Sequence, residues 1–266
     1  MGSDLAVRIA SAAVLAAVAL AGAWFGGIVA GLVLALFSAI VYLEWSGITG
    51  TARAVPPLVM PVAIAATTIA AGLGHWEIAL GIALAALVLA AVASRTAWQP
   101  LGVVYALAFG LSILALRLSP DFGLVAILFL FAVVWATDTG AYFVGRLIGG
   151  PKLWPAVSPK KTWSGAIGGL VAALVAGGAA AALAGIAVTP ALVAVALTLS
   201  VASQAGDLAE SALKRLFGVK DSGNIIPGHG GLMDRVDGLI FAGVAAAAIG
   251  WSHGGGARLA EGLLAW

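Results

Sequence analysis

Apolar residues follow one another in this chain in runs too long for a water-soluble core. One run, AVLAAVALAGAWFGGIVAGLVLALF, fills residues 13–37 without a charged side chain. Hydrophobic residues make up 62% of the 266 residues and charged residues 9%, whereas about a quarter of an ordinary soluble domain is charged. Because a backbone in hydrocarbon must satisfy its own hydrogen bonds, such runs favour helices. The sequence therefore predicts an all-α, polytopic membrane protein in a lipid bilayer.

The positions of charges and of glycine and proline clusters divide the apolar sequence into about nine transmembrane helices, each long enough to cross about 30 Å of hydrocarbon. We interpret the first as a retained helix, because no convincing cleavage site follows it. No repeat and no second domain are evident, so we expect one membrane domain, with N-terminal helices in residues 1–130 and polar motifs among the helices of residues 131–266. The predicted spans lie near residues 5–23, 25–43, 55–73, 76–93, 98–116, 122–145, 166–185, 187–205 and 239–257.

Basic residues are distributed unevenly over the connections between these spans. In a nine-span arrangement, only Arg117 and Arg258 of the thirteen basic residues fall on the side opposite the N-terminus. The positive-inside rule then places the N-terminus and the long connections 146–165 and 206–238 in the cytoplasm. The other eleven are Arg8, Arg53, Arg95, Arg146, Lys152, Lys160, Lys161, Lys214, Arg215, Lys220 and Arg235.

The segment SQAGDLAESALKR continues a predicted span with several polar residues. Helical spacing gives one face of this helix five polar residues: Ser203, Asp207, Glu210, Ser211 and Lys214. An ionised carboxylate near hydrocarbon is expensive unless it is paired, hydrated or bound to a metal. The face therefore fits either a set of ion pairs that solubilises the helix end or a binding site.

A second acidic pair, Asp234 and Asp237 in the segment DRVD, precedes the last apolar run. If a helix begins there, the two residues share one of its faces. Carboxylates without a His or Cys cluster are ligands for a hard cation, and Mg²⁺ is the natural candidate because it also binds substrate phosphate. The predicted metal ligands are Asp207, Asp234 and Asp237. Four basic residues near them are predicted to bind phosphate: Lys214, Arg215, Lys220 and Arg235.

Three glycines and a histidine lie just before DRVD, in the segment PGHGG. Pro227 is expected to begin a turn with its fixed φ. Gly228, Gly230 and Gly231 are expected to adopt positive φ and to expose successive N–H groups that form an anion-binding nest. His229 either contacts a phosphate or a base or only caps the loop.

The other polar connection follows WATDTGAYFVGRLIGG, in which Asp138 is a further carboxylate at membrane depth. In SPKKTW, Ser158 is predicted to cap a helix whose first residue is Pro159 and whose first turn holds Lys160 and Lys161. Lysines there oppose the helix dipole, which is tolerable where a phosphate binds. The alternative is a basic loop that contacts anionic lipid headgroups.

These motifs together resemble one enzyme family. Residues 211–237, which contain SALKR, KDSG and IPGHGGLMDRVD, resemble throughout their 27 positions the signature of the phosphatidate cytidylyltransferases (CDP-diacylglycerol synthases). DTGAY at residues 138–142 and SPKKTW at residues 158–163 are similar to motifs of the same family. Ser164 departs from the pattern, because an acidic residue commonly follows SPKKTW, and this puts in doubt any role for a carboxylate there.

The resemblance implies an enzyme of phospholipid biosynthesis that transfers the cytidylyl group of CTP to phosphatidic acid, giving CDP-diacylglycerol and pyrophosphate. It implies Mg²⁺ as cofactor, with a monovalent cation such as K⁺ as a further candidate, and a homodimer in the bacterial cytoplasmic (inner) membrane; no nucleic acid is expected as a partner. The lipid phosphate is itself the nucleophile, so no covalent intermediate is needed. Predicted catalytic residues are Asp207, Lys214, Arg215, Asp234, Arg235 and Asp237. Predicted substrate-binding residues are Asp138, Lys160, Lys161, Ser211, Lys220, His229, Gly230 and Gly231.

Two other functions fit parts of the sequence. A CDP-alcohol phosphotransferase also uses Mg²⁺ in a membrane, and residues 234–238 match the start of its acidic motif, but residues 239–250 carry no charge to continue that motif. An ion or lipid transporter would use the carboxylates of Asp138 and Asp207 along its pathway. It would not require a glycine turn beside clustered basic residues.

Overall fold

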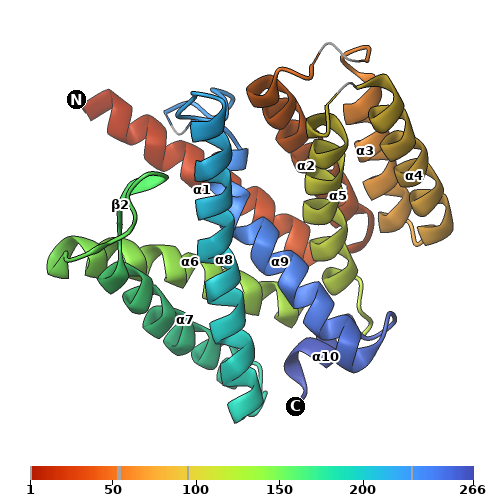
Figure 1. Ribbon diagram of the computed structural model, residues 1–266. Helices are drawn as coiled ribbons and strands as arrows, with labels where there is room; N and C mark the ends of the chain where they lie inside the picture. Colours follow the sequence, from red (N-terminus) through yellow and green to blue (C-terminus); the bar gives the residue numbers. More distant parts are fainter. Residues whose placement is uncertain (1, 53–54, 95, 229) are drawn as a thin grey trace. The chain divides into compact units, whose positions relative to one another are not determined.

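The computed structural model describes residues 2–52, 55–94, 96–228 and 230–266, without the side chains of residues 2–5 and 8. Ten helices and one two-stranded sheet lie within these residues (Figure 1). His229, Arg53, Arg95 and the side chain of Arg8, to which the sequence assigned a role or a side of the membrane, lie outside the described residues.

Each of the nine predicted spans overlaps a helix, which confirms the all-α membrane class. By length and composition, seven described helices are able to cross a bilayer: α2, α4, α5, α6, α7, α8 and α9. α1 and α3 supply shorter apolar stretches, Ile9–Phe25 and Val59–Gly72, so nine complete crossings stay a prediction. The helices are α1 (Gly2–Phe25), α2 (Gly27–Thr49), α3 (Val59–Gly72), α4 (Trp76–Ala93), α5 (Trp98–Arg117), α6 (Gly123–Ile148), α7 (Trp163–Leu183), α8 (Pro190–Leu216), α9 (Met233–Gly254) and α10 (Leu259–Leu264).

The chain forms two compact units that do not follow chain order. The first consists of Met1–Leu114 and Leu216–Val236, and the second of Ala115–Arg215 and Asp237–Trp266. In the first unit α2 packs against α1 and α3, and α3 packs against α4; in the second, α6 packs along α7 and also contacts α10. The expected division near residue 130 was drawn from motif content, and it stays a prediction.

Glycines let neighbouring helices of the second unit approach closely. A Cβ atom added to Gly165 of α7 would lie 2.8 Å from the carbonyl oxygen of Ala141 and 3.2 Å from the Cα atom of Gly145, both in α6. A Cβ atom added to Gly206 of α8 would lie 2.5 Å from the carbonyl oxygen of Asp237 in α9. Small residues at such contacts are typical of membrane helices. The α8–α9 contact places Asp207 beside the first turns of α9.

The connection between α6 and α7 is a β-hairpin, so the helix predicted from Ser158 is wrong. Strand β1 (Lys152–Trp154) pairs antiparallel with β2 (Ser158–Thr162). This pairing satisfies backbone groups that a helix would otherwise bond, and Pro159 is tolerated because each strand of a two-stranded sheet is an edge. The helix begins at Trp163, four residues after the predicted first residue Pro159, because Thr162 accepts a hydrogen bond from the N–H of Gly165 (3.1 Å) as its N-cap.

Replacing Gly165 with valine should destabilise the second unit, because the added side chain would overlap the backbone of α6. We expect a loss of about 1–3 kcal/mol, the usual range for overpacking. Gly178→Val is the matched control, since Gly178 is also in α7 and a Cβ atom there would meet nothing within 4 Å. Thermal unfolding in one detergent compares the two variants. Equal unfolding temperatures would contradict the close α6–α7 contact.

Candidate active site

Three carboxylates from three helices of the second unit form one polar cluster. Asp138 lies in α6, Asp207 in α8 and Asp237 in the first turns of α9. A hydrogen bond of 2.8 Å between the hydroxyls of Thr137 and Ser200 joins α6 to α8 next to Asp138. The three carboxylates are close enough to repel one another, and nearby ammonium groups offset part of this repulsion. The structure thus brings together two of the predicted metal ligands and the carboxylate predicted to bind substrate.

A lysine from the β-hairpin reaches this cluster. The Nζ atom of Lys161 lies 2.6 Å from Oδ2 of Asp207, while both side chains remain partly exposed. The hydroxyl of Ser211, one turn further along α8, donates to Oδ1 of Asp207 over 3.5 Å. The predicted helix face with Asp207 and Ser211 is therefore present, and Lys161 reaches it from a strand instead of the predicted helix turn.

The alternative interpretation of this helix face predicted ion pairs, and these also occur. α8 continues to Leu216, as the polar spacing indicated, and Lys214 lies 3.0 Å from Glu210, which is buried. Lys214 is itself mostly buried, with a side-chain exposure of 11%. The ammonium group of Lys214 is also near enough to Asp237 to offset part of the negative charge of the cluster.

The oxygen atoms of the cluster fit a hard cation. Besides the carboxylates they include the Oγ atom of Ser203, which is buried in α8 and has no hydrogen-bond partner among the described residues. Ser203 lies directly beside Gly238, one residue after Asp237. Within the described residues no three Asp, Glu or His side chains converge at ligand distance. Mg²⁺ is usually held by one or two carboxylates and completes its shell with water and phosphate, so the donor set fits that ion.

The glycine loop belongs to the first unit and is organised by a residue that the sequence did not single out. Glu44, near the end of α2, accepts hydrogen bonds from the N–H groups of Leu232 (2.9 Å) and Met233 (2.7 Å). Its Oε2 atom also lies 3.2 Å from the hydroxyl of Ser222. Glu44 is 5% exposed. The carboxylate therefore occupies the N-terminus of α9.

Asp234 closes the same network. Its Oδ2 atom accepts hydrogen bonds from the N–H of Ser222 (2.9 Å), the hydroxyl of Ser222 (2.8 Å) and the N–H of Gly231 (3.1 Å). Of the glycine N–H groups predicted to bind an anion, that of Gly231 does so, and the anion is the protein's own carboxylate. The other N–H donors to Glu44 and Asp234 belong to Ser222, Leu232 and Met233. The condition for a shared face is met, because α9 begins at Met233, six residues before the predicted span near 239–257, and holds Asp234 and Asp237 three residues apart. Asp234 as a metal ligand stays a prediction.

The glycines of the loop have two different roles. Gly228 and Gly230 have φ angles of 74° and 83°, as predicted. Gly231 does not have positive φ, so that part of the prediction is wrong. It is needed instead for space, because an added Cβ atom would lie 2.8 Å from both carboxylate oxygens of Glu44 and would overlap the hydroxyl of Ser222. The loop is closed by a hydrogen bond from the N–H of Ile226 to the carbonyl of Gly230 (2.9 Å).

The other predicted phosphate-binding residues that the structure describes lie on the surface. They are Lys160, Arg215, Lys220 and Arg235. His229 lies outside the described residues. Exposure of these side chains agrees with binding of a soluble anion but does not assign them individual roles.

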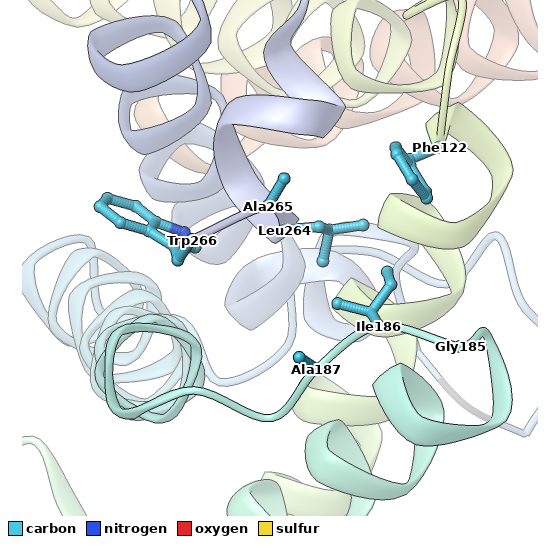
Figure 2. Close-up of a pocket in the computed structure, with 7 residues that line it drawn as sticks. All are labelled: Phe122, Gly185, Ile186, Ala187, Leu264, Ala265 and Trp266. Carbon is cyan, nitrogen blue, oxygen red and sulfur yellow. The ribbon is translucent and has the colours of Figure 1, made fainter.

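An apolar pocket of about 430 Å³ lies in the second unit (Figure 2), and none of the three carboxylates is among its lining residues. It is lined by Phe122 before α6, by Gly185–Ala187 between α7 and α8, and by the C-terminal residues 264–266. Asp138 and Asp207 lie fifteen or more residues further along α6 and α8, or roughly 20–25 Å at 1.5 Å per residue. The lining of the pocket has no charged side chain, so we do not assign the phosphate chemistry to this pocket.

Sequence reasoning missed Glu44, although the sequence contains a signal for it. Glu44 is the single charged residue in α2, and an isolated carboxylate in an apolar span is a candidate functional group. Its partners follow 178 or more residues later in the chain. No local pattern connects such distant segments.

Comparison with known proteins matches both polar clusters to one family. The model of the cytidylyltransferase family matches residues 6–253. A phosphatidate cytidylyltransferase of Brucella suis is 42% identical over 257 residues, which cover 90% of this chain and 91% of that protein. Phosphatidate cytidylyltransferases of Bacillus subtilis (48% over 122 residues; 46% of this chain, 45% of the relative) and Staphylococcus saprophyticus (49% over 120 residues; 45% and 46%) are also similar. The chain belongs to the cytidylyltransferase family.

The Gly231→Ala variant should lose stability and activity, because its methyl group would overlap Ser222 and the Glu44 carboxylate. We expect destabilisation of about 1–3 kcal/mol. Gly47→Ala is the control, since a Cβ atom at Gly47 in α2 would meet nothing within 4 Å. Thermal unfolding and turnover are measured for both. A Gly231→Ala protein as stable and active as Gly47→Ala would exclude the tight packing around Glu44.

Proposed function

We propose that this membrane protein transfers the cytidylyl group of CTP to phosphatidic acid, which gives CDP-diacylglycerol for phospholipid biosynthesis and releases pyrophosphate. The observation that carries the proposal is the family match over residues 6–253, which spans every polar motif of the chain. The relative from Brucella suis, which covers most of the chain, and the relative from Bacillus subtilis, which covers about half, are both named phosphatidate cytidylyltransferase.

The chemistry is a substitution at phosphorus. An oxygen of the phosphatidic acid phosphate attacks the α-phosphorus of CTP, the new P–O bond joins the two phosphates, and the bond from the α-phosphorus to the bridging oxygen of the β-phosphate breaks. Pyrophosphate leaves with the electron pair of that bond. Because both reactants are anions, the protein's contribution is to position them and to neutralise charge.

The carboxylates and cations of the second unit support this chemistry. Asp207 and Asp237 would hold Mg²⁺, with Asp138 and the hydroxyl of Ser203 as neighbouring oxygen donors, and Asp234 is a further proposed ligand. Bound there, Mg²⁺ would neutralise charge on the phosphates. Lys161 is placed by the β-hairpin at Asp207, so its ammonium group would contact a phosphate that approaches the metal ligands.

The other basic side chains would complete the phosphate contacts. Lys214 is held near the cluster by Glu210. On the surface, Lys160, Arg215, Lys220 and Arg235 would guide the anions, and Arg suits phosphate because its guanidinium group donates two parallel hydrogen bonds. The glycine loop with Gly230, Gly231 and His229 would border the nucleotide.

Several finer features are part of the proposal. The uneven distribution of basic residues supports a cytoplasmic N-terminus and cytoplasmic catalytic loops, where CTP is present. The bacterial sources of the relatives support the inner membrane. A second, monovalent cation such as K⁺ and a homodimer follow from the family resemblance.

The two alternative functions receive less support. A CDP-alcohol phosphotransferase would need further charged residues after Asp237, and Leu239 to Gly250 are all uncharged. A transporter that used Asp138 and Asp207 would not explain the family match.

Replacing Asp237 with asparagine should abolish turnover, because the variant removes a negative charge that would hold Mg²⁺. Pyrophosphate release by the purified protein with CTP, phosphatidic acid and Mg²⁺ should fall by about 100-fold or more. Asp121→Asn is the control, since Asp121 is exposed between α5 and α6. Omission of phosphatidic acid or of Mg²⁺ should also stop the wild type. A fully active Asp237→Asn variant would contradict the metal role.

Replacing Lys161 with methionine should raise the KM for an anionic substrate about tenfold or more, since a charged hydrogen bond to phosphate contributes about 1.5–3 kcal/mol. The matched control is Lys152→Met, because Lys152 is an exposed lysine in strand β1 of the same hairpin. Initial rates are measured over a range of CTP and of phosphatidic acid concentrations. Equal KM values in the two variants would show that Lys161 does not bind phosphate.

A further inference from the structure

We infer that Glu44, on a membrane helix of the N-terminal half, is a positioning residue for cytidylyl transfer: it caps the N-terminus of α9 and thereby orients the acidic side chains of its first turns. The inference rests on the proposed function. It assigns Glu44 no contact with substrate or metal.

The start of α9 has no N-cap side chain of its own. The residue before Met233 is Leu232, which offers no acceptor, and two glycines precede it. The first N–H groups of a helix need partners from outside the helix. Glu44 supplies them, because one carboxylate oxygen accepts from Leu232 (2.9 Å) and the other from Met233 (2.7 Å). A carboxylate here also interacts favourably with the helix dipole.

The same carboxylate is coupled to Asp234 through one hydroxyl group. The Oγ atom of Ser222 lies 2.8 Å from Oδ2 of Asp234 and 3.2 Å from Oε2 of Glu44. It also accepts a hydrogen bond from the N–H of Asp234 (3.3 Å). A change at Glu44 therefore alters the hydrogen bonds that hold the side chain and the backbone of Asp234. Asp237 follows one turn later on the same helix.

Burying the Glu44 carboxylate is costly unless its oxygen atoms accept hydrogen bonds. It is the single charged residue in α2, and it is 5% exposed. A buried carboxylate is tolerated when donors satisfy it. Two backbone N–H groups donate to this one, and the single proton of the nearby Ser222 hydroxyl goes either to Glu44 (3.2 Å) or to Asp234 (2.8 Å). Glutamine at this position would keep the shape but direct its amide N–H₂ group toward one of these donors. Glu44→Gln is thus a nearly isosteric test of the acceptor role.

The first measurement is hydrogen exchange of the purified full-length protein in detergent, followed by mass spectrometry. In Glu44→Gln, residues 226–236 should exchange about tenfold faster than in the wild type, while α9 beyond residue 240 should be unchanged. Glu77→Gln is the matched control, because Glu77 is an exposed acidic residue of another membrane helix, α4. This readout does not depend on activity.

The second measurement separates positioning from general destabilisation. In Glu44→Gln the Mg²⁺ concentration for half-maximal pyrophosphate release should rise about tenfold or more, as for other residues that orient metal ligands. The KM for phosphatidic acid should change less than twofold. At the same concentrations, Mg²⁺ with CTP should raise the unfolding temperature less in Glu44→Gln than in the wild type.

A second variant keeps the test decisive if Glu44→Gln does not fold. Ser222→Ala removes the hydroxyl shared by Glu44 and Asp234 and should produce the same two effects, and the double variant should be no worse than the more impaired single variant. Wild-type exchange and Mg²⁺ dependence in Ser222→Ala, or in a folded Glu44→Gln protein, would overturn the inference. A wild-type protein that folds but does not turn over would instead overturn the proposed function.

Discussion

Charged groups in a chain this apolar must be surrounded by other polar groups, and this constraint explains where its charges lie. Glu44 is buried, and it accepts hydrogen bonds from two backbone N–H groups beside the hydroxyl of Ser222, which it shares with Asp234. In the second unit, Asp207 is paired with Lys161 and Glu210 with Lys214. Because an isolated charge in hydrocarbon is expensive, these buried and half-buried carboxylates lie in polar clusters. The same clusters hold the residues proposed for catalysis.

Close helix contacts are the second requirement of such a site. Gly206 and Gly238 let α8 and α9 approach closely, because Gly206 faces the carbonyl of Asp237 and the side chain of Phe241, and Gly238 faces Ser203. Larger residues would separate the two helices and with them the carboxylates. In a soluble protein a hydrophobic core would hold the helices together, whereas in lipid their close packing has to do so. The glycines therefore contribute to the geometry of the proposed metal site.

The sequence predicted the features that depend on local spacing. The continuation of α8 beyond the predicted span, through Asp207 to Lys214, follows from helical spacing, and the structure confirms it. The start of α9 at Met233 meets the condition under which Asp234 and Asp237 share a face. The strand Ser158–Thr162 was missed, because Ser-Pro is a local helix-start signal while the pairing with Lys152–Trp154 is not local. Glu44 was missed for the same reason, since its partners lie in the distant loop before α9. Contacts between distant segments depend on tertiary packing, which no local pattern records.

The most direct test of the reaction follows the α-phosphate of CTP. The purified protein is incubated with phosphatidic acid, Mg²⁺ and CTP that carries a radioactive α-phosphate, and the lipid is then extracted. Cytidylyl transfer predicts label in the lipid fraction in equal amount to the pyrophosphate released, and no labelled lipid when the label is on the γ-phosphate. A folded protein that leaves all of the α-label in the aqueous phase would contradict this account.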